Sequence, residues 1–439
     1  MRILVYSYNY HPEPIGIAPL MTELAEGLVK RGHEVRVITA MPNYPERKIY
    51  ETYRGRWLTT EEKNGVKIQR CYVWIRPNPG LCTRLLLESS FVGLSFIQAL
   101  RGWRPDIILN TSPSLPVAVP VALLKLIYRC PTVLNLQDIL PEAAVQTGLI
   151  SNPWAIRVFE TLEKFAYRSA TQISVIAEGF RQNLLSKGVR GSKMKVISNW
   201  VDVNFIRPLP KYENAFRKVN GLGNKFVVLY SGNIARTQGI QTVIRAAARL
   251  QHVKDLVFVV VGEESQLADL DDLRKELNVH NVLMRPFAPR AELPEMLAAA
   301  DVGLIMQKRH VVGFNLPSKT QVLLASGRPV LAAVPAQGTA AQAIRDSGGG
   351  LVVEPENAKE LANAIQHLYN HPEITDKLGH QGRHHAMAEY SFEQALSRYE
   401  NLFKQLVQGQ PARSPYGKMT PQMVSADPTT NSQLPSQLR

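Results

Sequence analysis

Residues 228–244, with the sequence VLYSGNIARTQGIQTVI, combine an apolar run, a glycine-containing turn and the start of an amphipathic segment. The run 226–230 predicts a buried strand, Gly232 breaks it, and Gly239 opens a stretch with apolar residues at helical spacing. The first N–H groups of a helix have no intrahelical partner and carry about half a positive charge, so anions bind there readily. Arg236, inside the loop, could form paired hydrogen bonds with phosphate oxygens. The alternative interpretation is an ordinary strand-to-helix turn.

Length and composition describe a globular chain of 439 residues, 45% of them hydrophobic and 20% charged, which predicts two or three domains. The three cysteines form no C-x-x-C pair, which argues against a disulfide framework or a thiolate metal site. The first residues lack the apolar core of a signal peptide, and prolines and Lys125 interrupt the longest apolar run, 113–128. We therefore expect a cytoplasmic protein that does not span a membrane.

The formal net charge of +14 implies an anionic partner. Phosphorylated substrates, anionic lipid and nucleic acid all fit this sign of charge. The chain has no zinc-finger spacing, no RNP-like aromatic strand and no dense block of Lys and Arg, so we expect no nucleic-acid partner.

Apolar runs alternate with amphipathic segments over the first 200 residues, beginning with strand, loop, helix and strand. This order predicts a parallel βαβ unit, and its repetition predicts a doubly wound sheet. The expected strands are 2–8, 34–39, 66–73, 106–111, 132–137, 172–176 and 194–199, and the expected helices are 19–31, 81–101, 117–129 and 152–168.

A second α/β series follows the proline-rich, charged stretch 204–225, which we interpret as a linker. Its expected strands are 226–230, 256–261, 282–286, 302–306, 330–333 and 351–353. We thus predict two Rossmann-like domains (1–203 and 226–384), a C-terminal helix (385–408) that could pack back on the first domain, and a disordered polar tail (409–439). Two such domains place their strand ends on either side of one cleft, which is the default ligand site.

Five stretches, in this order, resemble the group 1 family of retaining glycosyltransferases, whose GT-B fold consists of two Rossmann-like domains. They are PEPIGIAP with LAEGLVKRGHEV (12–35), YSGNIARTQG (230–239), FAPRAELPEMLAAADVGL (287–304), LPSKTQVLLASGRPV (316–330) and YSFEQALSRY (390–399). The resemblance covers nearly the whole chain to about residue 408. It is strongest to the enzymes that build colanic acid and related exopolysaccharides.

This resemblance implies transfer of a sugar, with retention at the anomeric carbon, from a nucleoside diphosphate donor to a saccharide acceptor. The donor would be a GDP- or UDP-sugar, the first domain would bind the acceptor, and no cofactor or metal would be needed. Gly16 would approach the donor diphosphate from the first domain and counts among the catalytic residues. The donor-binding residues would be Gly232, Asn233, Arg236, Gln238, Gly239, Phe287, Ser318 and Lys319.

The chain departs from the family pattern at two places. Many members carry Arg and Lys where Asn233 and Gln238 stand, and Arg236 and Lys319 are our candidates to replace those charges. The usual pair of glutamates, with seven residues between them, is absent, since Phe314 and Val322 align with it. The family's ribose and sugar contacts therefore cannot be carried over.

Asp138 stands where many members have a catalytic histidine, directly after the expected strand 132–137. A carboxylate there could accept a proton from an acceptor hydroxyl or orient the donor sugar. The alternative is that Asp138 caps a following helix, and Glu142 is a weaker candidate. No D-x-D motif is placed to hold a metal, because Asp269, Asp271 and Asp272 fall in an expected surface helix.

The acceptor of such enzymes is often lipid-linked, and the apolar helix expected over 85–100 suits a bilayer interface because Arg84, Arg101, Trp103 and Arg104 flank it. A buried core helix is the alternative. The net charge favours a peripheral association with the inner face of the plasma membrane.

Two other functions share this fold. A nucleotide-sugar 2-epimerase would change the donor without an acceptor, and a non-catalytic relative would bind nucleotide sugar without turnover. A dinucleotide oxidoreductase is excluded, because the first loop has the single glycine Gly16 instead of G-x-G-x-x-G.

Overall fold

The computed structural model describes residues 1–409 except 15, 45, 76–80, 113, 147, 149, 236 and 314–315, and leaves out the side chains of 81–86, 88 and 89. Arg236, Phe314 and residues 410–439 of the predicted tail therefore lie outside the described residues.

The first sheet has eight strands, and successive strands are added first on one side of β1 and then on the other. From one edge to the other it consists of β3 (Leu58–Lys63), β4 (Val66–Cys71), β2 (Glu34–Ala40), β1 (Arg2–Tyr6), β5 (Ile107–Thr111), β6 (Thr132–Leu136), β7 (Gln172–Val175) and β8 (Met194–Val196). All neighbours are parallel except β3 and β4. The chain builds outward from β1 on one side and then continues from β5 on the other, so the carboxyl ends of β1 and β5 form a topological switch point.

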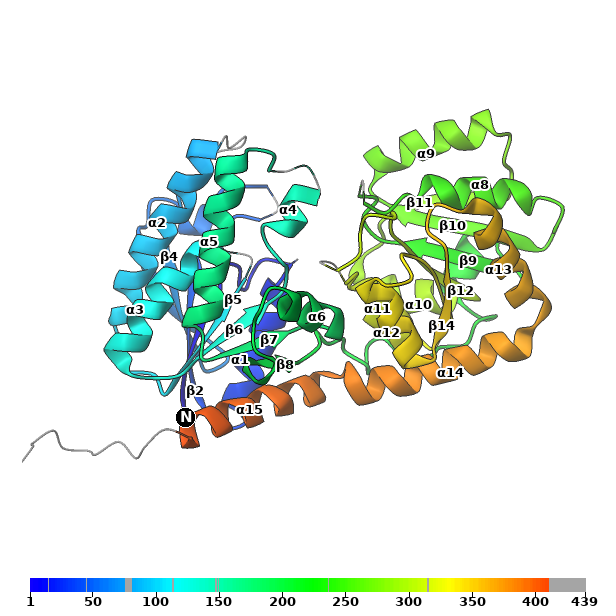
Figure 1. The fold of residues 1–439 in the computed structure, drawn as a ribbon. Coiled ribbons are helices and arrows are strands. Elements are labelled where there is room, and N and C mark those ends of the chain that lie inside the picture. Colours follow the sequence, from blue (N-terminus) through cyan, green and yellow to red (C-terminus); the bar gives the residue numbers. More distant parts are fainter. Residues whose placement is uncertain are drawn as a thin grey trace, which may run out of the picture.

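Helices cover both faces of this sheet (Figure 1). They are α1 (Ala18–Lys30), α2 (Leu81–Leu100), α3 (Ala118–Tyr128), α4 (Glu142–Gln146), α5 (Pro153–Ser169) and α6 (Glu178–Ser186). Alternate residues of β1 point to opposite faces: Ile3 and Val5 pack with α1, whereas Leu4 and Tyr6 pack with α2 and α3. The prediction of a doubly wound parallel sheet is confirmed.

The region 41–65, which lies between two strands expected from the sequence, contains the edge strand β3. Its sequence LTTEEK has no apolar alternation, and its antiparallel pairing with β4 leaves most of its side chains partly or fully exposed. Charged side chains at a sheet edge also discourage pairing with other molecules.

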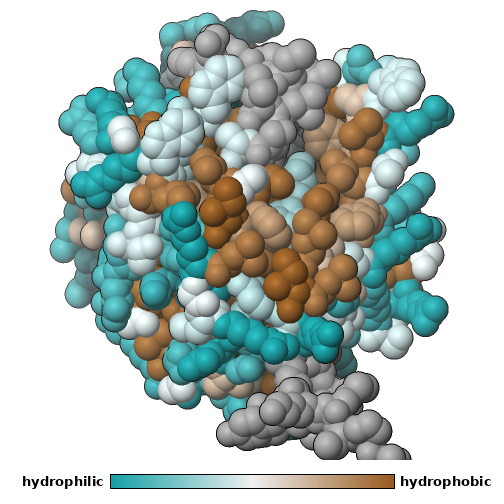
Figure 2. All heavy atoms as spheres, turned by 90° about the vertical axis from the view of Figure 1, so that its left-hand side faces the viewer, coloured by the Kyte–Doolittle hydropathy of each residue, from teal (hydrophilic) through white to brown (hydrophobic). Residues whose placement is uncertain are grey.

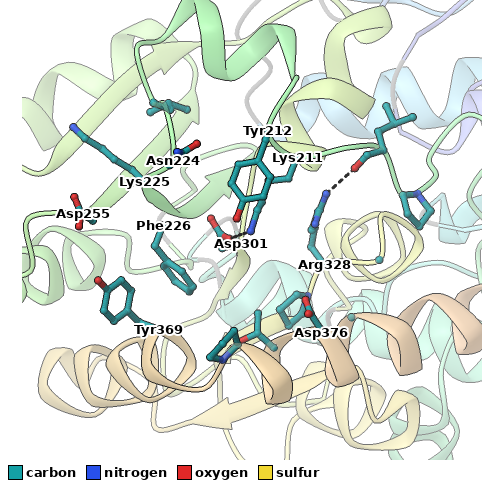
Figure 3. Close-up of a pocket in the computed structure, with 18 of the residues that line it drawn as sticks. Lys211, Tyr212, Asn224, Lys225, Phe226, Asp255, Asp301, Arg328, Tyr369 and Asp376 are labelled. Atoms are coloured by element: carbon teal, nitrogen blue, oxygen red, sulfur yellow. Dashed lines mark hydrogen bonds and ion pairs between the residues drawn. The ribbon is translucent and has the colours of Figure 1, made fainter.

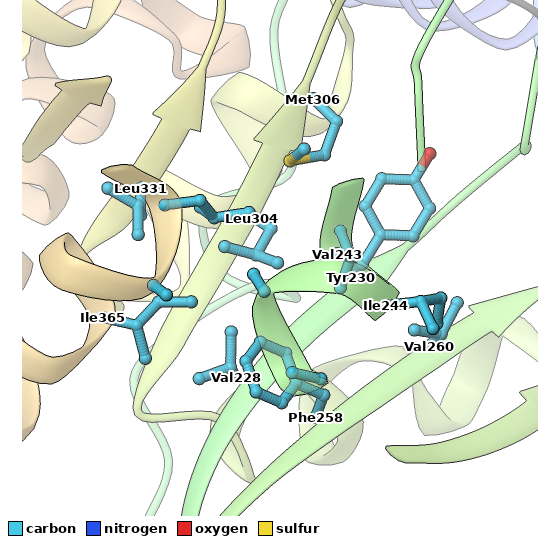
Figure 4. Close-up of a cluster of buried hydrophobic side chains, with 14 of the residues drawn as sticks. Val228, Tyr230, Val243, Ile244, Phe258, Val260, Leu304, Met306, Leu331 and Ile365 are labelled. Carbon is cyan, nitrogen blue, oxygen red and sulfur yellow. The ribbon is translucent and has the colours of Figure 1, made fainter. Parts of the chain in front are cut away.

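The second sheet is wholly parallel, and its strand order reverses between the neighbours β9 and β12. Its order is β11 (Val282–Pro286), β10 (Leu256–Gly262), β9 (Phe226–Ser231), β12 (Val302–Met306), β13 (Val330–Ala333) and β14 (Gly350–Val353). Its helices are α7 (Ala215–Val219), α8 (Gln241–Arg249), α9 (Glu264–Glu276), α10 (Leu293–Ala298), α11 (Lys319–Ala325), α12 (Thr339–Ser347) and α13 (Ala358–Asn370). Figure 4 shows one face of its core, where Val228, Phe258 and Leu304 from three strands meet Ile244 of α8 and Ile365 of α13.

Two long helices, α14 (Pro372–Glu389) and α15 (Phe392–Gln408), run from the second domain back along the first (Figure 1). Leu396 and Phe403 of α15 belong to the core of the first domain, and Asn135 at the end of β6 donates a hydrogen bond to the Tyr399 hydroxyl (2.7 Å). A Cβ on Gly27 would lie 2.6 Å from the Phe392 ring, so glycine permits the close approach of α1 and α15. The boundary expected after residue 384 falls inside α14.

The stretch 204–225, expected as a linker, instead packs against the second domain. Arg217 of α7 is buried, forms an ion pair with Asp301 (2.9 Å) and donates to the Ala299 carbonyl oxygen (2.9 Å). Lys211 also pairs with Asp301 (2.6 Å). This pair lies beside a cavity of about 690 Å³ at the amino-terminal ends of the strands (Figure 3). The proline-rich, charged stretch 204–225 therefore covers the amino-terminal ends of the strands of the second sheet.

Asp301→Ala is expected to lower the free energy of unfolding by about 3–5 kcal/mol, because it leaves the buried guanidinium of Arg217 without a counter-charge. It also removes the acceptor of the Val227 N–H, at 2.8 Å. Asp271→Ala is the matched control, since Asp271 pairs on the surface of α9 and is expected to contribute about 1 kcal/mol or less. Urea denaturation of both variants measures the difference, and equal losses would contradict this account.

Candidate active site

A cavity of about 670 Å³ lies between the two domains, at the carboxyl ends of both sets of strands. The first domain lines it with residues of the loops that follow β1, β6, β7 and β8: Asn9, Gly16, Ile17, Gln137, Asp138, Ile176 and Asn199, and with Leu20 of α1. The second domain lines it with Ser231, Gly232, Asn233, Gln238, Leu293, Leu297, Leu316, Pro317, Ser318, Lys319, Val322 and Leu323. Loops next to both switch points therefore share one cavity.

Most of the candidate residues meet in this cavity. Seven of them line it: Gly16, Asp138, Gly232, Asn233, Gln238, Ser318 and Lys319. Gly239 and Phe287 are not among the lining residues, and Phe287 is 53% exposed just after β11. Arg236 lies outside the described residues, so its role stays a prediction.

Lys319, the first residue of α11, reaches the loop that follows β9. Its Nζ lies 3.4 Å from the side-chain oxygen of Gln238 and 3.9 Å from the centre of the Tyr230 ring. Among the described residues no carboxylate forms an ion pair with it. Burial lowers the pKa of Lys319 to about 7. A buried ammonium group without a counter-charge is a strong site for an anion.

Glycine at position 232 makes this approach possible. Gly232 has a φ of 140°, which other residues rarely adopt, and a Cβ there would lie 2.9 Å from the Nζ of Lys319. The loop is further held by the Tyr230 hydroxyl, which donates to the Asn233 carbonyl oxygen (2.8 Å) and also contacts the side-chain oxygen of Gln238. Tyr230 was not among the residues singled out from the sequence.

The helix N-terminus expected as the anion site lies farther along the chain. α8 begins at Gln241, whereas the lining residues of the cavity end at Gln238 in this loop. Gly239 has a φ of 62°, and a Cβ there would lie 3.3 Å from the side chain of Lys308. The role of Gly239 in the structure is conformational, and among the described residues that line the cavity the cation is Lys319.

Glu13 positions the loop that carries Gly16. One oxygen of its buried carboxylate accepts hydrogen bonds from the N–H groups of Asn43 (2.8 Å) and Tyr44 (2.9 Å). The other accepts from the side chain of Asn9 (2.6 Å). Gly16 itself has a φ of 71° and open space where a side chain would start.

Asp138 follows β6 and faces the cavity from the first domain. Burial raises the pKa of its carboxyl to about 6, and its N–H lies 3.5 Å from the Ser112 hydroxyl oxygen. α4 begins at Glu142, so the alternative that Asp138 is a helix N-cap is wrong. A carboxyl with this pKa exchanges its proton near neutral pH, as a general base must.

Glu142, the weaker candidate, is engaged elsewhere: it accepts from Asn183 (3.0 Å) and pairs with Lys187 (3.3 Å). Gln137 and Asn199, which were not singled out, exchange two hydrogen bonds of 3.0 and 2.7 Å at the cavity. Asp138 was singled out by its family position, a signal that does not extend to Gln137 and Asn199, although each is the last residue of an expected strand, 132–137 and 194–199.

The domains match two known families. Residues 16–200 match the family described as "Glycosyl transferase 4-like domain", and residues 212–385 match "Glycosyl transferases group 1". Over 415 residues the chain is 31% identical to the putative colanic acid biosynthesis glycosyl transferase WcaI of Escherichia coli, covering 93% of this chain and 99% of that one. The chain belongs to the group 1 glycosyltransferases.

A further relative and two solved structures match at lower identity. The probable glycosyltransferase WbjE of Pseudomonas aeruginosa is 27% identical over 68% of this chain and 76% of its own length. Among solved structures, a sucrose-phosphate synthase of Thermosynechococcus elongatus superposes with a TM-score of 0.70 at 18% identity, covering 93% of this chain and all of that one. HepE of Anabaena, in complex with UDP, gives 0.68 at 20% identity, covering 92% of this chain and all of its own. These likenesses confirm the GT-B fold of this glycosyltransferase.

Neither a membrane-spanning helix nor a cluster of metal ligands occurs in the part of the chain that the structure describes. No described helix combines the length and apolarity needed to cross a bilayer. Within the same residues, no group of three His, Cys, Asp or Glu side chains is arranged to hold a metal ion.

Proposed function

We propose that this glycosyltransferase moves a sugar, with retention, from a nucleoside diphosphate donor to a saccharide acceptor in exopolysaccharide biosynthesis. The proposal rests on the buried Lys319, which lies against Gly232 at the cavity and forms no ion pair with a carboxylate among the described residues. A diphosphate would supply the missing counter-charge. The HepE structures with UDP and with UDP-glucose support a nucleotide sugar as the donor class, with GDP- and UDP-sugars as the two candidates.

In the proposed reaction, the bond between the anomeric carbon and the β-phosphate oxygen breaks, and the acceptor oxygen bonds to that carbon. Negative charge grows on the leaving diphosphate, where the Lys319 ammonium would stabilise it. Lys319, protonated when the diphosphate is bound, would supply positive charge there, so we propose that the transfer needs no metal. Asp138, on the opposite wall, would accept the proton of the acceptor hydroxyl or orient the donor sugar.

The proposed acceptor is a saccharide, carried on a lipid. Its saccharide nature follows the likeness to WcaI, a putative colanic acid glycosyl transferase. Asn9, Gln137 and Asn199 line the first-domain side of the cavity with amide groups, which suit sugar hydroxyls.

The test is a panel of UDP-, GDP- and TDP-sugars, each incubated with the protein and with lipid-linked saccharide acceptors. We expect release of one nucleoside diphosphate that depends on acceptor, and a product whose anomeric configuration, read by NMR coupling constants, matches that of the donor. Epimerised donor without acceptor would establish a 2-epimerase instead. Donor binding without any turnover would establish a non-catalytic relative.

A further inference from the structure

Apolar side chains lie exposed along three neighbouring helices of the first domain. On α3 they share one helical face at a spacing of four, three and one residues. The exposed residues are Ile97 and Leu100 of α2, Val119, Leu123, Leu126 and Ile127 of α3, and Trp154, Val158 and Phe165 of α5, here called the α2–α3–α5 face. Figure 2 looks at this side of the molecule and shows hydrophobic residues gathered at its centre, with hydrophilic ones around them.

Hydrogen bonds join the carboxyl ends of these helices into one surface. The Tyr128 hydroxyl donates to the Ala99 carbonyl oxygen (2.9 Å), which ties α3 to α2. Lys125 donates to the Ser169 carbonyl oxygen (2.7 Å), which ties α3 to α5. Phe91 and Ala99 of α2 are buried, whereas Ile97 and Leu100 are exposed. The helix therefore has a core face, as the interpretation as a core helix expected, and an exposed apolar face, which contact with a bilayer requires.

Positive charge surrounds the apolar residues. Among the described side chains of the three helices and the segments that directly follow them, the only exposed carboxylate is Glu160. The exposed cations are Arg101, Arg104, Arg129, Arg157, Lys164 and Arg168. Lys164 and Arg168 also line a groove of about 1080 Å³, whose other charged lining residues are Lys187, Arg190 and Lys193 and the carboxylates Glu142, Glu160 and Glu163.

We propose that the α2–α3–α5 face docks on an anionic lipid bilayer. Apolar side chains would enter the interface between headgroups and acyl chains, and the surrounding cations would meet lipid phosphates. A second copy of the chain is a poorer occupant, because a twofold interface would set these six cations against the same six of its partner. The inference rests on the proposed function only in that docking would hold the enzyme at the membrane that carries a lipid-linked acceptor.

The test is co-sedimentation of the full-length protein with vesicles of phosphatidylcholine alone or with added phosphatidylglycerol. We expect binding to the anionic vesicles, weakened by salt, and little binding to the neutral ones. Leu126→Glu, at a position 72% exposed, is expected to weaken binding at least tenfold. Arg129→Gln together with Arg168→Gln is expected to weaken it by roughly fivefold per charge.

Val219→Glu is the matched control, because Val219 is 84% exposed on α7 of the second domain and its replacement should leave vesicle binding unchanged. Thermal melting and nucleotide binding, measured for every variant, report the fold and the donor site separately. Failure of the wild-type protein to bind anionic vesicles overturns the proposal, even if it transfers sugar to a soluble acceptor. It is also overturned if Leu126→Glu dissociates a dimer while vesicle binding persists. Vesicle binding without nucleotide binding would overturn the proposed function and leave the docking surface intact.

Discussion

Replacing Lys319 by methionine is expected to lower the turnover number for sugar transfer by about 10²–10³-fold, the usual effect of removing one group that stabilises a leaving anion. The reason is its position: the ammonium group is buried at the cavity, 3.4 Å from the Gln238 oxygen. Methionine has a similar length and flexibility, so the loop that contains Gly232 should keep its shape. Steady-state transfer assays with saturating acceptor measure the change.

The same substitution should not reduce stability. Since burial lowers the pKa of Lys319 to about 7, its charged form is disfavoured in the folded protein, and removing the charge should maintain or raise the melting temperature near neutral pH. Arg309→Ala is the matched control: Arg309 is an exposed cation after β12, paired with Glu354 at 3.2 Å, and its loss should leave turnover close to wild type. Wild-type turnover in Lys319→Met would contradict the assignment.

Asp138→Asn is expected to lower the turnover number by about 10²–10⁴-fold, the range for loss of a general base, while donor binding stays close to wild type. Asparagine has the same shape but cannot accept the proton. Asp106→Asn is the control in the same domain, because Asp106 accepts from the Arg2 N–H (2.8 Å) at the other end of the sheet. Equal losses in both variants would indicate a structural role for Asp138.

The pH profile separates a base from a purely structural carboxylate. With a pKa raised to about 6, Asp138 is ionised above that pH and protonated below it. The value of kcat/KM should therefore fall about tenfold per pH unit as the pH decreases below about 6. Asp138→Asn should lose this dependence, and an unchanged acidic limb in that variant would contradict the role.

The sequence was sufficient to predict both parallel sheets and the loops at their carboxyl ends. Buried strands such as β10, with the sequence LVFVVVG, are apolar on both faces, and glycine marks the turn after β9. Both signals depend only on neighbouring residues in the sequence, so the strands and the turns after them could be predicted without the tertiary structure. Gly232 was found in the same way, at a break after a buried strand, whereas Asp138 was found because the family resemblance aligns it with a catalytic position.

Features that depend on tertiary packing were not predictable. Lys319 acquires its low pKa only when α11 and the loop after β9 enclose it. The stretch 204–225 looked like a linker because it is rich in proline and charge, and its anchors, Lys211 and Arg217, pair with Asp301, which lies more than 80 positions away along the chain. The exposed face of α3 carries the same residue types as its buried face, and only the packed structure separates Leu126 from Leu124.

The most direct test of the account is whether nucleoside diphosphate binding protonates Lys319. At about pH 8 most Lys319 is neutral in the free protein, because its pKa is about 7. A bound diphosphate should raise that pKa, so binding should take up as much as one proton, and affinity should fall as the pH rises above about 7. The phosphate contributes little, since its own pKa is about 6.

Isothermal titration calorimetry with UDP and GDP, in buffers of different ionisation enthalpy, measures this proton uptake. The account predicts uptake for the nucleotide that binds, and its loss in Lys319→Met. Binding without proton uptake, or equal uptake in the variant, would contradict the placement of the donor diphosphate against Lys319.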